Sequence, residues 1–138
     1  MRWLALFALV VLTGCSSLQR EADDEAARVA DHVLPEALDD AISAADPKSS
    51  AERRGAAKKW LSDPDPSVMD GQRNVKWEVR GSKGTTIWVN LYTYVESADL
   101  LPPDQGEATW GVVCRAYDVA RAVKTTTVEC PDDTPEEP

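Results

Sequence analysis

The chain is poor in the residues on which most enzymes depend. It contains a single histidine, His32, with no cysteine at metal-ligand spacing. A lone histidine between Val29 and Val33 on a helical pattern is typical of a surface or boundary position. The chain also lacks the GxSxG nucleophile elbow, the HExxH zinc motif, a phosphate-binding glycine loop and the dinucleotide fingerprint. We therefore expect no catalytic residues, no metal site and no cofactor.

Basic residues are also scarce. The chain has 15 lysines and arginines against 24 aspartates and glutamates, which gives a formal net charge of -9. So acidic a chain is repelled by nucleic acid and by anionic lipid headgroups. We expect no nucleic-acid partner.

A short apolar run opens the chain. Arg2 is followed by "WLALFALVVL", from Trp3 to Leu12. This run is too short to span a bilayer, which takes roughly 20 apolar residues, but it has the length of the apolar core of a secretory signal.

The tetrapeptide "LTGC", Leu12 to Cys15, follows this run and resembles the lipobox of bacterial lipoproteins. The resemblance implies cleavage between Gly14 and Cys15, a diacylglycerol on the Cys15 sulfur and acylation of the new amine. Residues 1–14 would be the signal peptide and 15–19 a lipidated tether, on the extracytoplasmic side of a bacterial membrane. An ordinary signal peptide and a buried N-terminal helix are the alternatives, and the helix is disfavoured because a small chain has little core to surround it.

The cysteine count agrees with export. There are three cysteines, and an odd one in an exported protein needs an explanation, which lipidation of Cys15 supplies. Cys114 and Cys130 then remain as a pair, and in a small exported domain a disulfide is the expected state. By closing a loop, the bridge would reduce the entropy of the unfolded chain and so stabilise the domain by roughly 3 kcal/mol. If Cys114 lies opposite Cys130 in a hairpin, then Ala116 faces Val128 and Asp118 faces Thr126.

Two helices are predicted in the first half of the mature chain. From Ala22 to Ala45 apolar residues recur at spacings of three and four, which indicates an amphipathic helix with a kink or short break at Pro35. A second helix begins near Ser49 and Glu52, which have capping-box spacing, and ends at about Leu61.

Four strands follow, at about 74–80, 85–96, 109–119 and 123–130, and Gly81 to Gly84 form a hairpin turn. The second strand is apolar on both faces, which is typical of a central strand. Residues 20–130 therefore form a single α+β domain, with a long and a shorter helix packed on an antiparallel four-stranded sheet. The acidic, proline-rich tail 131–138 is expected to be disordered.

Two sets of side chains are candidates for a site. Asp63, Asp65 and Asp70 suggest calcium, but the EF-hand spacing is absent and prolines stiffen the loop. The other carboxylate clusters are most simply solvated helix faces. The second set is aromatic: Trp77, Trp88, Tyr92, Tyr94 and Trp110.

Core packing is the favoured interpretation of the aromatic set, and a sheet face presented to a partner is the alternative. Trp88, Tyr92 and Tyr94 share one face of the second strand and form the candidate binding face. The sequence leaves open which face the helices cover. The function it favours is a membrane-tethered binding or interaction module, for an envelope protein or an apolar ligand. A small extracytoplasmic enzyme that uses carboxylates is the alternative.

Overall fold

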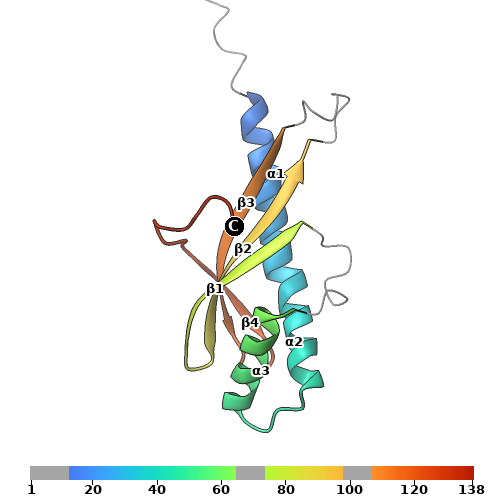
Figure 1. The fold of residues 1–138 in the computed structure, drawn as a ribbon, viewed down its shortest axis with the longest axis vertical. Coiled ribbons are helices and arrows are strands. Elements are labelled where there is room, and N and C mark those ends of the chain that lie inside the picture. Colours follow the sequence, from blue (N-terminus) through green and yellow to red (C-terminus); the bar gives the residue numbers. More distant parts are fainter. Residues whose placement is uncertain (1–12, 65–73, 98–106) are drawn as a thin grey trace, which may run out of the picture.

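The computed structural model describes residues 13–64, 74–97 and 107–138. Within these ranges a four-stranded antiparallel sheet has the strand order β1-β2-β3-β4, and the helices cover one of its faces (Figure 1). This arrangement confirms the predicted α+β class. The elements are α1 Thr13–Arg28, a π-helical turn Val29–Val33, α2 Leu34–Ala44, α3 Ser50–Ser62, β1 Val75–Lys83, β2 Thr86–Glu96, β3 Ala108–Asp118 and β4 Lys124–Val128.

The long helix stays helical through Pro35, and its irregularity lies in the π turn just before that residue. The Leu34 N–H donates to the Val29 carbonyl, and Pro35 has no N–H to offer. The Ala30 carbonyl therefore loses its usual helical donors. The hydroxyl of buried Tyr117 donates to it instead, at 2.7 Å.

A bidentate ion pair also ties the π turn to β3. Arg115 Nε and Nη2 lie 2.7 and 3.1 Å from the Asp31 carboxylate, and the hydrogen bond raises the pKa of Arg115. The shorter helix α3 begins as predicted, because the Ser49 side chain accepts from the Glu52 N–H.

The first hairpin turns later than predicted. Gly84 occupies the turn with φ 59°, a left-handed conformation that favours glycine. The expected turn residue Gly81 lies inside β1, at a bulge between Val79 and Gly81. Because the bulge absorbs one residue, pairing continues to Lys83 opposite Thr86.

The disulfide between Cys114 and Cys130 is present, with a Cα–Cα distance of 5.1 Å, but the predicted register is wrong by two residues. Cys114 pairs with Val128 and Ala116 with Thr126. Strand β4 ends at Val128, so Cys130 reaches its partner after the chain has left the sheet.

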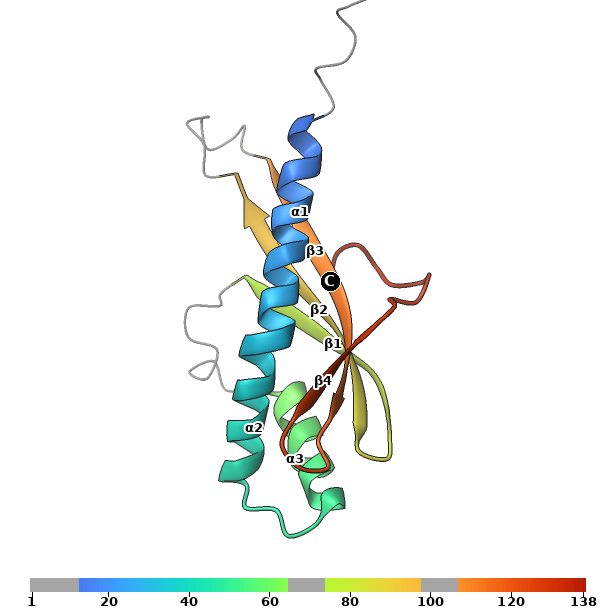
Figure 2. The ribbon, with the colours of Figure 1, turned by 180° about the vertical axis from the view of Figure 1, so that it is seen from behind.

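The helices cover the face of β2 that carries Ile87, Val89 and Leu91, all of which are buried in the core with α2 and α3. Helix α1 lies close against β3 at Gly111, where a Cβ would stand 2.1 Å from the Ala22 carbonyl oxygen (Figure 2). The Thr93 hydroxyl donates to the same carbonyl at 2.8 Å. The face with Trp88, Tyr92 and Tyr94 is therefore the one that the helices leave uncovered.

Both ends of the described chain make contacts with the sheet. Residues 15–19, predicted as a tether, fall within α1, and the Gln19 amide bonds to Thr109 and to the Trp110 carbonyl. The tail 131–138 has neither helix nor strand, yet it lies on the side of the sheet opposite α1 (Figures 1 and 2). The disulfide at Cys130 and an ion pair between Arg80 and Asp133 hold it there.

Candidate functional site

The candidate site is the sheet face opposite the helices, called the open face here. Strand register places on it Lys76 of β1, Tyr92 of β2 and Val112 of β3, which lie side by side. Its other members follow by alternation along the strands. They include Glu78, Arg80, Trp88, Asn90, Tyr94, Trp110, Cys114 and Ala116.

Aromatic rings form one end of the open face. Tyr94 and Trp110 are cross-strand partners with ring centroids 5.1 Å apart and an interplanar angle of 53°. The Lys76 ammonium lies 5.4 Å from the Trp110 ring centroid, within cation–π range. Because both rings are only half-buried, this end combines apolar surface with a positive charge.

Tyr92 is the fully buried member of the candidate binding face. It lies on the open face but is only 1% exposed, so it is not a surface contact in this state. It lines a hollow of about 650 Å³ together with Pro135 and Pro138 of the tail. Its buried hydroxyl has no hydrogen-bond partner among the residues that the structure describes.

A second hollow of about 400 Å³ lies at the Trp88 end, between the strands and Pro131. Asn90 is 1% exposed there, and its amide nitrogen has no hydrogen-bond partner within the described ranges. Arg80 lines the same hollow and pairs with Asp133 at 3.0 Å.

Sequence reasoning missed Lys76, Arg80 and Asn90 as members of this face. A signal existed for Asn90, because a polar residue in the middle of a strand that is apolar on both faces must be buried at a cost. Lys76 and Arg80 had only the alternation of β1, which also fits an ordinary solvated face.

Trp77, by contrast, belongs to the helix side. Its ring stacks on Trp60 at 5.7 Å, and its indole nitrogen donates to the Leu61 carbonyl at 2.9 Å. Core packing is therefore correct for Trp77, whereas Trp88, Tyr94 and Trp110 lie on the open face.

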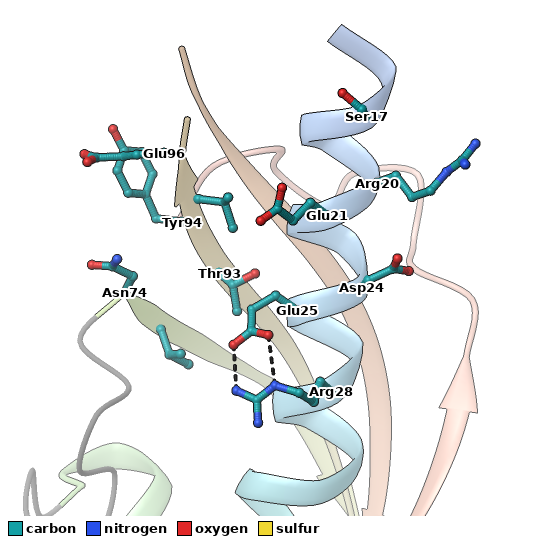
Figure 3. A pocket seen from close by; sticks show the side chains of 12 residues that line it. Ser17, Arg20, Glu21, Asp24, Glu25, Arg28, Asn74, Thr93, Tyr94 and Glu96 are labelled. Atoms are coloured by element: carbon teal, nitrogen blue, oxygen red, sulfur yellow. Dashed lines mark hydrogen bonds and ion pairs between the residues drawn. The ribbon is translucent and has the colours of Figure 1, made fainter. Parts of the chain in front are cut away.

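A third hollow, of about 940 Å³, lies between α1 and the ends of β1 and β2 and is lined mainly by charged and polar side chains (Figure 3). Glu21 and Glu25 extend from α1 toward the strands, whereas the Tyr94 ring points away from α1. Arg28 lies 2.6 Å from the Glu25 carboxylate, and this hydrogen bond lowers the pKa of Glu25. A carboxyl group so shifted stays ionised at neutral pH and is a poor general acid.

The remaining candidates do not converge on a site. His32 is exposed on the π turn, Asp63 is exposed after α3, and Asp65 and Asp70 lie outside the described residues. Across the three described ranges, no group of three or more histidine, cysteine or acidic side chains could hold a metal ion. A search of the same residues finds no helix of the length and hydropathy needed to cross a membrane.

Comparison of the chain with protein-family models, curated proteins and solved structures finds no match.

Proposed function

We propose that this protein is a lipid-anchored interaction module on the extracytoplasmic side of a bacterial membrane, and that it binds its partner through the open face. The observation that carries the binding role is the sheet face that the helices leave uncovered, where Tyr94, Trp110 and Lys76 form an aromatic and cationic surface. Aromatic residues on such a face are the side chains that most often dominate binding energy.

The "LTGC" motif and the cysteine pairing support the lipid anchor. Cys114 and Cys130 are bridged, so Cys15 is the cysteine that remains for lipidation. Structural disulfides form and persist in oxidising compartments outside the cytoplasm. Two or three acyl chains on one residue would anchor the chain stably, whereas a single chain binds only marginally.

The contacts of α1 support a short distance between anchor and domain. Gln19 lies four positions after Cys15 in the chain, and its side chain already bonds to β3. At about 1.5 Å of helical rise per residue, this separation is about 6 Å. The domain would therefore stand next to the bilayer surface, where it meets other envelope proteins.

The alternative, an enzyme that uses carboxylates, would need a carboxyl group with a raised pKa. The clear shifts among described carboxyl groups are those of Glu25 and Asp118, and both pKa values are lowered. Asp118 accepts hydrogen bonds from the Ala120 N–H and the Thr85 hydroxyl, which stabilise its charged form. These observations favour the interaction module.

The anchor is tested by Cys15→Ser, with Ser16→Ala as the matched control that leaves "LTGC" intact. After expression in a bacterial host and a high-salt wash of membranes, the control should stay in the membrane fraction. Cys15→Ser should be released or mislocalised. If Cys15→Ser is fully processed and still membrane-bound, the anchor is wrong.

A further inference from the structure

The C-terminal tail is the segment that now occupies the open face. It starts at the disulfide, pairs with Arg80 through Asp133, and ends with Pro135 and Pro138, which are exposed and line the hollow beside Tyr92. Its last four residues read "PEEP", which is the PxxP pattern of segments that dock on aromatic-lined surfaces as polyproline II helices.

The tail covers this face without filling it. Hollows of about 400 and 650 Å³ are bordered by residues of both the tail and the strands. Four buried side-chain polar atoms in the described residues lack a hydrogen-bond partner, and three of them belong to this boundary: Asn90 Nδ2, Tyr92 Oη and Thr134 Oγ1. Burying such groups unpaired costs free energy. The tail is therefore an imperfect occupant that a better one can replace.

We propose that the open face is a binding site for an extended, acidic, proline-containing peptide segment of a partner protein, and that the chain's own tail competes for it. This inference rests on the proposed function and names both the partner chemistry and the regulation of that site. The tail is the resident occupant when no partner is present.

The chemistry of the face matches such a segment. A polyproline II backbone has no internal hydrogen bonds, so its carbonyls are free to accept from Asn90 Nδ2 and Tyr92 Oη. Trp88, Tyr94 and Trp110 offer ring surfaces to prolines. Arg80 offers positive charge to acidic side chains, as it already does to Asp133, and Lys76 offers a second positive charge, with Glu78 between the two on β1.

The test compares the full chain with a chain that ends at Cys130. The probe is a fluorophore-labelled peptide with the sequence PDDTPEEP, measured by fluorescence polarisation. A tethered tail has an effective concentration of about 1 mM. A peptide with a dissociation constant of about 0.1 mM for the truncated chain should then bind the full chain about tenfold more weakly. Circular dichroism and an intact disulfide establish that the truncated chain is folded.

A full-length double variant, Asp133→Asn with Pro135→Ala, serves if truncation prevents folding. It loosens the tail and should bind the peptide more tightly than the unaltered chain. In the truncated chain, Arg80→Gln should weaken peptide binding severalfold. Lys83→Gln, a change at an exposed residue of the same strand, should not. A peptide with all three prolines replaced by alanine should bind at least tenfold more weakly.

The inference is overturned if the folded truncated chain does not bind the peptide at millimolar concentration. It is also overturned if the alanine peptide binds equally well, or if the full chain binds as tightly as the truncated one. Another outcome is that the peptide does not bind, while a photoreactive group placed at position 94 still crosslinks a partner protein on intact cells. In that case the proposed function stands and only the peptide chemistry is wrong.

Discussion

Two buried tyrosines provide a matched experiment on what hydrogen bonding contributes in this domain. Tyr117 and Tyr92 are 0% and 1% exposed, and both belong to the central strands. The Tyr117 hydroxyl donates to the Ala30 carbonyl, which the π turn and Pro35 leave without a helical donor. The Tyr92 hydroxyl has no partner within the described part of the chain. Replacement by phenylalanine removes a buried hydroxyl group that is hydrogen-bonded at Tyr117 and has no hydrogen-bond partner at Tyr92.

The expected effects have opposite signs. Tyr117→Phe leaves a buried carbonyl unpaired and should lower the free energy of unfolding by about 1–3 kcal/mol. Tyr92→Phe removes a buried hydroxyl that has no bond to lose, so the free energy of unfolding should stay the same or rise by about 1 kcal/mol. With a urea dependence of about 1.5 kcal/mol per molar, Tyr117→Phe should lower the urea midpoint by about 1 M.

A substitution at Pro35 tests whether the unpaired Ala30 carbonyl is the cause of the stability lost in Tyr117→Phe. Pro35→Ala restores a backbone N–H that can donate to the Ala30 carbonyl, so Tyr117→Phe should cost less in that background. Urea titrations of the four combinations give the coupling free energy directly. Equal losses at Tyr117 and Tyr92, or additive effects of Tyr117→Phe and Pro35→Ala, would refute the reasoning.

Two further outcomes follow from the packing and the charges. Gly111→Ala should destabilise the domain by about 1–3 kcal/mol, because its Cβ would stand 2.1 Å from the Ala22 carbonyl oxygen. Gly81→Ala is the control, since a Cβ there would meet open space, and it should cost much less stability. Thermal melts of the two variants measure the difference. Asp118 has a pKa below its ordinary value of 3.8, so its contribution to stability is complete above that value and is lost as the pH falls through the lowered pKa. Asp118→Asn should therefore flatten the acid limb of a plot of urea midpoint against pH, and an unchanged limb would contradict the hydrogen bonding assigned to Asp118.

Much of the fold was predictable because it depends on local periodicity. The alternation in β1, the three-and-four spacing of the long helix and the cap at Ser49 each reflect short-range geometry. The hairpin register was not predictable in the same way. The bulge at Gly81 and the exit of the chain at Val128 depend on how neighbouring strands and the disulfide fit together.

The candidate site was predictable only in outline. The sequence identified Trp88, Tyr92 and Tyr94 as one face, but both faces of β2 are apolar, so the covered face depended on where the helices pack. Composition predicted a disordered tail, because acidic, proline-rich segments bury little. What holds the tail is long-range: the bridge to Cys114 and the ion pair with Arg80, neither of which composition reveals.

Site-specific photo-crosslinking on intact cells determines whether the open face is the interaction surface. A photoreactive phenylalanine derivative replaces Tyr94 on the open face or, as the control, Lys58, which is exposed on α3. If the open face binds the partner, position 94 should give a defined protein adduct that disappears with Trp88→Ser and increases when residues 131–138 are removed. Adducts of equal yield from both positions, or adducts from position 58 alone, would contradict this role of the open face.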